Sequence, residues 1–499
     1  MLDPDVCYRA LRARDERFDG RVFVGVTSTG IYCRPVCPAG HAKRENCRFF
    51  PSAAAAQEAG FRPCLRCRPE TAPEHGSWRG TSNTVSRGLA LIAEGALDGD
   101  DASVDRLAAR LGVGERQLRR LFKQHLGASP VSVAQTRRVL FAKQLIHDSR
   151  LPMAEVALAA GFGSVRRFNE TFQLLFQRAP SALRRKTVVA LPEGSVASAG
   201  VTVLLRYRGP YDWESMLAYL RARAIDGVER VSDAAYHRTI AFEGGMGTIE
   251  VRDLPELQSL GATIRFPGVR ALPDIVTRIR RVFDLGADVV AIGVHLTRDP
   301  LLAPLVAARP GLRAPGAWDG FELAVRAVLG QQVSVGAGRK LGSRLVEICG
   351  GRRNGAGPAE GTLAVAFPDA TRVLHADLDA LRMPSARRQT LVALAKATLA
   401  DPLLFQPRRT LDETVAALRE IRGIGEWTAH YIALRAAREP DAFPASDVAL
   451  LRAATDRAGT RPTPKELYAR AEPWRPWRAY AAQHLWAKSA RASDGGLPT

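Results

Sequence analysis

Hydrophobic residues follow two different periods along this chain. From about residue 84 to 186 they recur at helical spacing, as in VDRLAARLGVGERQLRRLFKQHL, and arginine supplies most of the charge, which predicts an all-helical basic unit. From about 188 to 295, β-branched runs such as VTVLLRYRG, RTIAFE, GTIEVRD and GATIRFPG predict a small antiparallel sheet, with one helix, YDWESMLAYLRAR, between the first two strands. From about 300 to 490 amphipathic helices return, separated by Gly and Pro.

Cysteines set the first part of the chain apart from the rest. Six of the seven lie in the first seventy residues, and only Cys349, in EICGG, lies beyond and is expected to be a packing residue. The stretch 71–83 is rich in Gly, Ser, Thr and Pro without periodicity, which is typical of a linker. We therefore expect a multidomain, mostly α protein with α+β parts, divided into residues 1–75, 84–186, 188–300 and 301–490.

Composition and charge indicate the class of partner. The chain has 499 residues, 46% of them hydrophobic and 24% charged, which is ordinary for globular domains. Its 71 Lys and Arg against 51 Asp and Glu leave a net charge of +20, which favours a polyanion, and nucleic acid first. An acidic membrane is the competing partner, but no basic amphipathic helix or membrane-spanning apolar run stands out. The charged N-terminus lacks a signal core, so we expect a cytoplasmic, nucleoid-associated protein with reduced thiols.

Two cysteine pairs have the spacing of metal ligands. Cys33 and Cys37 are separated by three residues, and Cys64 and Cys67 by two, so each pair can reach one tetrahedral zinc ion from a tight turn. A four-thiolate site most often only stabilises a small domain, and spacing alone favours that interpretation. Cys47 fits neither pair and is expected to be a small buried hydrophobe.

The residues around these pairs suggest a further role. TGIYCRPVCPAGHAKRENCRFF and AGFRPCLRCRPE, within residues 1–75, resemble the N-terminal domain of the Ada methyltransferase family. The resemblance implies that Cys33 is both a zinc ligand and a nucleophile, and that Thr29 and Arg62 lie near the DNA backbone. It implies one zinc ion with four cysteine ligands: Cys33, Cys37, Cys64 and Cys67.

The chemistry implied for Cys33 is stoichiometric methyl transfer. Zinc keeps a sulfur as thiolate at neutral pH, and four thiolates around one Zn²⁺ carry a net charge of −2. A methyl phosphotriester is an uncharged phosphate whose methyl carbon is open to in-line attack, so the anionic cluster can approach it while ordinary phosphates repel the cluster. Methylation of Cys33 lowers the cluster charge to −1, and DNA affinity is expected to rise.

The basic helical unit contains two similar halves. Residues 103–126 predict helix, turn at Gly112 and helix, and residues 152–176 repeat the pattern with a turn at Gly161 to Gly163. A generic helical hairpin also has this pattern, but LFKQHLGASP and AAGFGSVRRFNETFQLLFQRAP resemble the AraC-type DNA-binding domain.

The AraC-type resemblance places the recognition helices near Glu115 and Ser164. About half of their polar residues are expected to be only solvated surface. Gln177 stands where that family usually has Gly, which predicts a changed helix end and a retained fold. The residues implied to lie near groove or phosphates are Arg116, Gln117, Arg119, Arg120, Arg166, Arg167 and Asn169.

A hairpin of glycines lies in the last part of the chain. TVAALREIRGIGEWTAHYIALRAA predicts helix, a turn at Gly423 and Gly425 with positive φ, and a second helix whose N-terminus can present amides to a DNA phosphate. With DAFPASD shortly after it, this segment resembles the helix-hairpin-helix glycosylase superfamily, and residues 188–490 resemble its AlkA branch.

That resemblance implies that Asp447 is catalytic. Cleavage of an N-glycosidic bond builds positive charge on the sugar, which a carboxylate can stabilise while water adds at C1′. The alternative is that Ser446 or Asp447 only caps the following helix, and the two roles are compatible.

Aromatic residues are expected to bind a flipped, electron-deficient base. Trp427 and Tyr431 lie one helical turn apart, and Trp486 matches a third aromatic position of the family, although each can instead be core. Trp427 also occupies the position of the Schiff-base Lys of lyases, which implies a monofunctional enzyme. Gln332 stands at the position of the wedge that fills the gap left by the base.

Together these features predict a regulator of the response to DNA alkylation that is also a 3-methyladenine-type glycosylase. Its expected partners are double-stranded DNA, both alkylated and promoter DNA, and RNA polymerase during activation. The rival hypothesis is a transcription regulator with a structural zinc and a degenerate glycosylase scaffold. No Pro-Cys-His-Arg motif is present, so O6-methylguanine repair is not expected.

Overall fold

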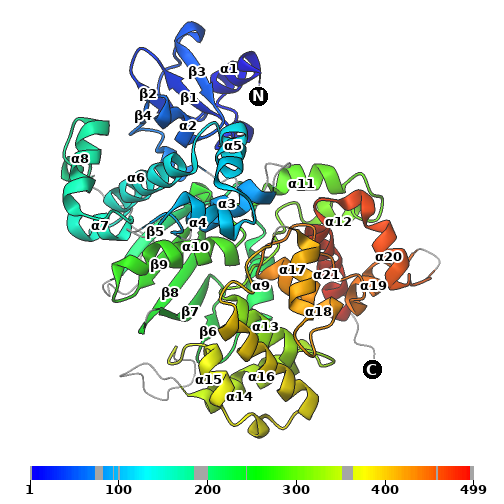
Figure 1. The fold of residues 1–499 in the computed structure, drawn as a ribbon. Coiled ribbons are helices and arrows are strands. Elements are labelled where there is room, and N and C mark those ends of the chain that lie inside the picture. Colours follow the sequence, from blue (N-terminus) through cyan, green and yellow to red (C-terminus); the bar gives the residue numbers. More distant parts are fainter. Residues whose placement is uncertain are drawn as a thin grey trace. The chain divides into compact units, whose positions relative to one another are not determined.

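The structure is a computed structural model that forms two compact units (Figure 1). The first contains Met1–Tyr207 and Leu254–Thr277, and the second Arg208–Asp253 and Arg278–Thr499. The predicted linker falls mostly outside the described residues, as do the edges of three expected domains at 73–75, 185–186 and 188–199. The residues described are 3–72, 83–93, 95–98, 102–184, 200–242, 244–350, 363–408, 410–456 and 459–494.

A small sheet holds the cysteine-rich region together. Its strands follow the order β3-β1-β2-β4; β1 is antiparallel to β2 and β3, and β2 is parallel to β4. Phe23, Tyr32, Ala56 and Phe61 form the core between sheet and helix, and Cys47 is buried as predicted. The elements are α1 (Pro4–Ala13), β1 (Phe23–Val26), β2 (Ile31–Cys33), β3 (Cys47–Phe50), α2 (Ala53–Glu58) and β4 (Arg62–Pro63).

The next part of the first unit is helical, as the periodicity predicts. Gly112 and Gly161 make the turns of the two halves with φ of 67° and 80°. Gln177 ends α8 with φ 54°, the left-handed conformation that glycine favours, so the helix end keeps the usual geometry and the prediction of a changed helix end is wrong. The helices are α3 (Asn83–Ala93), α4 (Val104–Arg110), α5 (Glu115–Leu126), α6 (Pro130–Asp148), α7 (Met153–Ala159) and α8 (Val165–Phe176).

The predicted strands are present and antiparallel. Their order is β5-β9-β8-β7-β6, and the short β6, which the sequence analysis missed, pairs with β7. The predicted helix between the first two strands is α9. The elements are β5 (Val201–Arg206), α9 (Trp213–Arg223), β6 (Glu229–Val231), β7 (Ala235–Phe242), β8 (Gly245–Leu254) and β9 (Ser259–Arg265), followed by α10 (Leu272–Val282).

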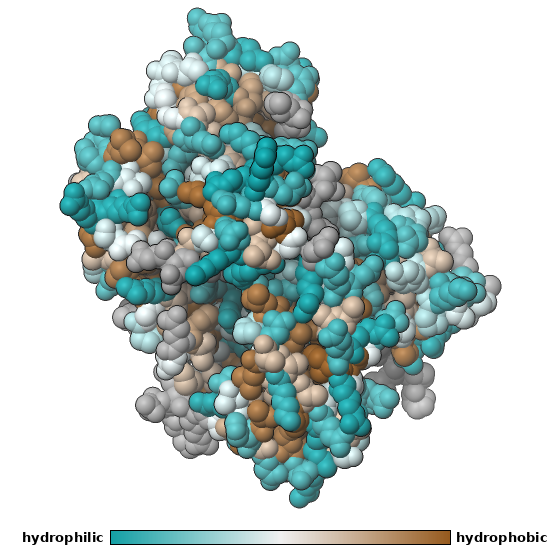
Figure 2. Space-filling view, viewed as in Figure 1, coloured by the Kyte–Doolittle hydropathy of each residue, from teal (hydrophilic) through white to brown (hydrophobic). Residues whose placement is uncertain are grey.

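The described residues from 289 onward are mainly helical, and Trp474, Phe443 and Leu485 are buried among them. Figure 2 shows hydrophilic residues over most of the visible face, with hydrophobic ones scattered among them. No helix among the described residues is long and apolar enough to cross a membrane. The helices are α11 (Val289–Leu296), α12 (Ala303–Ala308), α13 (Gly320–Leu329), α14 (Val335–Cys349), α15 (Ala370–His375), α16 (Ser385–Ala400), α17 (Leu411–Arg419), α18 (Glu426–Arg435), α19 (Val448–Ala453), α20 (Pro464–Arg470) and α21 (Arg478–Asp494).

Candidate functional site

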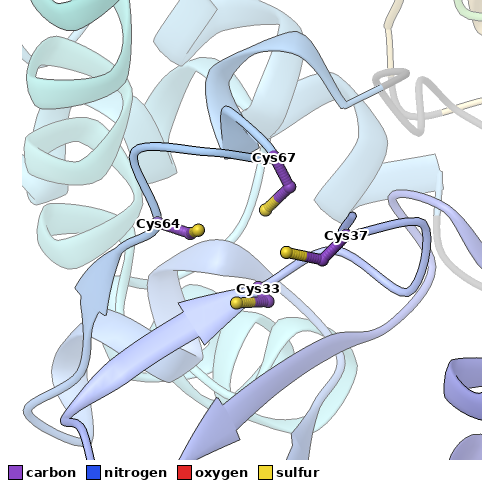
Figure 3. Close-up of side chains that lie close together, drawn as sticks. All are labelled: Cys33, Cys37, Cys64 and Cys67. Carbon is purple, nitrogen blue, oxygen red and sulfur yellow. The ribbon is translucent and has the colours of Figure 1, made fainter. Parts of the chain in front are cut away.

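The two cysteine pairs meet at one point. Cys33 ends β2 and Cys64 follows β4, and because these strands pair in parallel, Tyr32 beside Pro63, the two cysteines leave the sheet side by side. Figure 3 shows all four side chains pointing toward a common centre. The sulfurs of Cys33, Cys37, Cys64 and Cys67, called here the cysteine cluster, all lie within 4.8 Å of one another.

This arrangement fits a zinc ion. Tetrahedral zinc with Zn–S bonds of 2.3 Å requires sulfurs about 3.8 Å apart. Without a cation, hydrogen bonding to Cys37, Cys64 and Cys67 raises the pKa of the Cys33 thiol, so this sulfur would hold its proton. Cys33, Cys37, Cys64 and Cys67 therefore have the number, donor type and spacing of a structural or reactive zinc-thiolate site.

Cys33 differs from the other three cysteines in its surroundings. It is half-buried, whereas the other three are at most 6% exposed. The backbone N–H of Arg34 donates to the Cys67 sulfur and that of Arg66 to the Cys64 sulfur, both at 3.3 Å. No backbone N–H in the described part of the chain donates to Cys33. A hydrogen bond to a thiolate withdraws negative charge from the sulfur. Cys33, which is also the most exposed of the four, therefore keeps more of its negative charge than Cys64 and Cys67.

A buried arginine supports the loop that holds the cluster. Arg34 is 4% exposed, and its Nε donates to Asp19 Oδ1 at 2.8 Å. Its Nη1 donates to the carbonyl oxygen of Cys67 at 3.0 Å and to Thr71 Oγ1 at 2.8 Å. Arg34, which lies between Cys33 and Cys37, therefore joins the first cysteine pair to Cys67 of the second pair and to Thr71 beyond it.

The two predicted backbone-contacting residues lie next to β2, the strand that carries Cys33. Thr29 is exposed in the turn between β1 and β2, four residues before Cys33. Arg62 is half-buried in β4, where it pairs with Ile31 of β2.

The predicted recognition helices begin where the sequence places them. α5 starts at Glu115, and α8 starts at Val165 with Ser164 as its N-cap. Four of the predicted contact residues already have a partner on their own helix: Arg119 pairs with Glu115, Arg120 with Gln117, which is itself one of the four, and Arg166 with Glu170. All seven side chains are exposed: Arg116, Gln117, Arg119, Arg120, Arg166, Arg167 and Asn169.

Asp447 is the centre of the second site. It is the N-cap of α19, and its Oδ1 accepts hydrogen bonds from the backbone N–H groups of Ala449 at 2.9 Å and Leu450 at 3.0 Å. Trp486 Nε1 donates to the same Oδ1 at 3.0 Å, while Trp427 Nε1 donates to Oδ2 at 2.8 Å. Four donors thus fix the carboxylate, and Oδ2, which accepts only one of them, is the oxygen with room for a further partner.

The three predicted aromatic residues gather around this carboxylate. The Trp427 and Tyr431 rings are stacked, with centroids 5.4 Å apart and planes 9° apart. Trp486 meets the Tyr431 ring edge-on at 6.3 Å. All four side chains are half-buried, so the carboxylate site, defined as Asp447, Trp427, Tyr431 and Trp486, is neither sealed core nor open surface.

Two residues of this site were missed by the sequence analysis. The Arg435 guanidinium lies over the rings of Tyr431 and Trp486 at 5.4 and 5.1 Å. Tyr219 of α9 brings its hydroxyl within 3.3 Å of that of Tyr431. Burial alone would raise the pKa of Tyr431, but the guanidinium groups of Arg435 and Arg223 outweigh it, and the pKa is lowered. Burial raises the pKa of Tyr219 to about 12. Arg435 follows Tyr431 by one turn and was detectable by spacing; Tyr219 is remote in sequence.

The glycine hairpin before α18 is only partly as predicted. Gly423 has φ 91°, and a Cβ there would lie 1.9 Å from Thr390 Oγ1, so this position requires glycine. Gly425 has φ −81° and is the N-cap of α18, so the prediction of positive φ is wrong for it.

The wedge position lies beside this hairpin. Gln332 is exposed with φ 58°. Its neighbour Gln331, which the sequence analysis did not single out, donates at 3.2 Å to the Gly423 carbonyl oxygen and to Thr428 Oγ1. The wedge loop and the hairpin are therefore tied together.

Comparisons with known proteins match successive parts of the chain to different domain families. The metal binding domain of Ada matches residues 6–70, a helix-turn-helix domain matches 107–186, and the AlkA N-terminal domain matches 202–319. The DNA-3-methyladenine glycosylase 2 of Escherichia coli is 34% identical over 56% of this chain and 95% of its own length. A 3-methyladenine DNA-glycosylase from Archaeoglobus fulgidus shares the fold of 58% of this chain and 99% of its own, with a TM-score of 0.51 and 19% identity.

The fold and the two sites define a class: multidomain proteins that join an Ada-type zinc domain and a helix-turn-helix domain to a glycosylase fold. A "probable bifunctional transcriptional activator/DNA repair enzyme AlkA" of Mycobacterium tuberculosis is 40% identical over 97% of this chain and 96% of its own length. The chain belongs to this family of bifunctional activator and repair proteins, and the predicted fold class and four-cysteine zinc site are confirmed.

Proposed function

We propose that the chain repairs alkylated DNA by two reactions and regulates the response to alkylation. It accepts a methyl group from DNA methylphosphotriesters at Cys33, and it hydrolyses the N-glycosidic bond of alkylated bases of the 3-methyladenine type at Asp447. The observation that carries this proposal is the convergence of Trp427 and Trp486 on the Asp447 carboxylate, in a chain that also carries the cysteine cluster.

In the first reaction the Cys33 sulfur attacks the methyl carbon of the triester. The S–C bond forms as the C–O bond breaks, and the DNA phosphate leaves as an ordinary diester anion. Cys33, Cys37, Cys64 and Cys67 would hold a zinc ion, which would keep the Cys33 sulfur as a thiolate. The other three sulfurs are buried, and hydrogen bonds from the backbone hold Cys64 and Cys67, which leaves Cys33 as the acceptor. Thr29 and Arg62 bind the neighbouring backbone.

In the second reaction the flipped base lies against Trp427, Tyr431 and Trp486. Asp447 Oδ2 faces the sugar and stabilises the positive charge that develops as the bond to the base breaks, while water adds at C1′. The alkylated base leaves without protonation because alkylation has already made it cationic. Gly423 and Gly425 bind a DNA phosphate through the hairpin, and Gln332 fills the gap in the duplex. Position 427 holds Trp and not the Lys that forms a Schiff base in lyases, so the enzyme does not cut the strand.

Regulation follows from the change of charge at the cluster. Methylation of Cys33 removes one negative charge, DNA affinity rises, and the helices α5 and α8 bind promoter DNA and recruit RNA polymerase. The functional domains are residues 1–75, 84–186, 188–300 and 301–490, and the protein acts at the nucleoid. A degenerate glycosylase scaffold would have no need of four hydrogen bonds to Asp447.

One preparation of the full chain tests both reactions. Duplex DNA treated with a methylating agent is incubated with the protein, and methyl on protein and free 3-methyladenine are measured together. Cys33→Ala is expected to abolish methyl uptake and to keep base release; Asp447→Asn is expected to do the reverse. Cys47→Ala, a buried cysteine outside the cluster, and Asp412→Asn, an exposed carboxylate, are the matched controls. Methyl uptake in Cys33→Ala or undiminished base release in Asp447→Asn would overturn the respective assignment.

A further inference from the structure

A lysine of the helical part of the first unit lies buried under the cysteine cluster. Lys143, on α6, is 0% exposed. Its Nζ donates to the backbone carbonyl oxygen of Cys64 at 2.9 Å and to Glu70 Oε2 at 2.6 Å. A side chain from the helical domain therefore holds the backbone of a zinc ligand.

A second contact joins the same two segments one helical turn away. Arg68 directly follows Cys67, and its guanidinium donates to Asp148 Oδ1 at 2.7 Å and to Glu70 Oε1 at 3.0 Å. Burial favours the neutral form of Glu70, but Lys143, His147 and Arg68 together outweigh this effect and lower the pKa of the carboxyl. Arg68 and Glu70 from the cysteine-rich segment thus alternate with Lys143 and Asp148 from α6 in one network of opposite charges.

Burial makes this network different from ordinary surface ion pairs. Taking a charge out of water is expensive, and the charge is tolerated only if a partner and hydrogen bonds compensate it. The Lys143 and Glu70 side chains are 0% and 1% exposed, so neither can exchange its partner for water. By contrast, Arg137 and Arg138 of the same helix pair with Asp98 at about one-fifth exposure and bind α6 only within the helical domain.

We propose that Lys143 is a positioning residue of the zinc centre, so that the methyl-acceptor site is completed by the DNA-binding domain. By holding the Cys64 carbonyl and Glu70, Lys143 fixes the turn that presents Cys64 and Cys67. Outer contacts of this kind typically contribute tenfold to a hundredfold to metal affinity. Because such coupling is reciprocal, zinc bound at the cluster also holds the C-terminal half of α6 in place. The inference rests on the zinc site of the proposed function and does not require methyl transfer.

Zinc affinity of the full chain tests the proposal. Competition with the chromophoric chelator 4-(2-pyridylazo)resorcinol is measured for wild type, Lys143→Met and Arg137→Met. Lys143→Met is expected to weaken zinc binding about 10–100-fold, and Arg137→Met, which breaks a pair on the same helix, to change it less than about threefold. The double variant Lys143→Met/Glu70→Gln is expected to lose less than the two single variants combined, because no unpaired charge remains. Unchanged zinc affinity in Lys143→Met, or an equal loss in Arg137→Met, would overturn the proposal.

A second measurement on the wild-type chain keeps the test valid if a variant fails to fold. Hydrogen exchange is followed with and without zinc in peptides covering residues 140–148 of α6, with α16 in the second unit as the internal control. Zinc removal is expected to speed exchange in the α6 peptides at least about tenfold and to leave α16 unchanged. Equal exchange in α6 with and without zinc would contradict the coupling. Neither experiment reads methyl transfer or base release, so failure of those activities is distinguishable from failure of this inference.

Discussion

The cysteine cluster and the carboxylate site both hold an anionic group with N–H donors, but they distribute these donors differently. In the cluster, backbone N–H groups bind the Cys64 and Cys67 sulfurs, and Cys33 receives none within the described residues. At the carboxylate site all four donors converge on one residue, Asp447. An uncompensated thiolate is suited to form a bond and be consumed, whereas a fully oriented carboxylate is suited to stabilise charge and be reused.

The two sites also depend on different support. The cluster lies in a small sheet domain that is held by zinc and by buried ion pairs such as Arg34 with Asp19. The carboxylate site is built from side chains of α18 and α21 and from the N-cap of α19. This difference predicts that treatments directed at metal or charge separate the two activities.

Zinc removal is expected to have the largest effect. Structural zinc sites contribute on the order of 10 kcal/mol to folding, so chelation is expected to unfold residues 3–72 and to abolish methyl uptake, while base release continues. Limited proteolysis with and without chelator, read by mass spectrometry, locates the cuts. Loss of base release in step with zinc would contradict the separation of the two sites.

Arg34→Met is expected to cost the domain that carries the cluster about 3–5 kcal/mol, because it leaves the buried Asp19 carboxylate unpaired. Urea-induced zinc release, followed with the chromophoric chelator, measures this loss. Arg17→Ala is the control: it removes an ion pair with Asp15 whose arginine is 81% exposed, and the midpoint is expected to stay nearly unchanged. Equal midpoints for Arg34→Met and wild type would refute the supporting role of Arg34.

Acid is expected to weaken the second unit through His484. Burial lowers the pKa of His484 from its ordinary 6.5 to about 4. Below pH 6.5 His484 binds a proton in the unfolded chain but stays neutral in the folded chain. The free energy of unfolding therefore falls by about 3 kcal/mol as the pH falls from 6.5 to 4. Denaturant unfolding across this range measures the slope, and His484→Gln is expected to flatten it. A slope that persists unchanged in this variant would assign the effect to other groups.

Trp486→Phe is expected to have the smallest effect of the four. It keeps a ring beside Tyr431 but removes the N–H that binds Asp447 Oδ1, and a hydrogen bond to a charged group contributes about 1.5–3 kcal/mol. The single-turnover rate of base release is expected to fall about tenfold to a hundredfold, with methyl uptake unchanged. A wild-type rate of base release in this variant would show that the Trp486 indole contributes only apolar contacts.

The features of the fold and of the sites that could be predicted are those whose residues lie close together in the sequence. The zinc ligands form two pairs, and the spacing within each pair already indicates that both cysteines can reach one metal ion. Asp447, Trp427 and Tyr431 also lie close together in the sequence. Strands of two to four residues, β4 and β6 among them, were missed because such runs carry no measurable alternation. Contacts between distant segments were also missed: Tyr219 reaches Tyr431 across 212 residues, and Lys143 belongs to a basic helix yet is completely buried.

The chain is expected to carry both a reagent that is consumed and a catalyst that turns over. A single time course measures this most directly: excess methylated duplex DNA is incubated with a known amount of the wild-type chain, and protein-bound methyl and free base are counted per chain. Methyl uptake is expected to stop at one per chain, while base release is expected to continue beyond one. Base release that also stops at one per chain, or methyl uptake that exceeds one, would contradict this expectation.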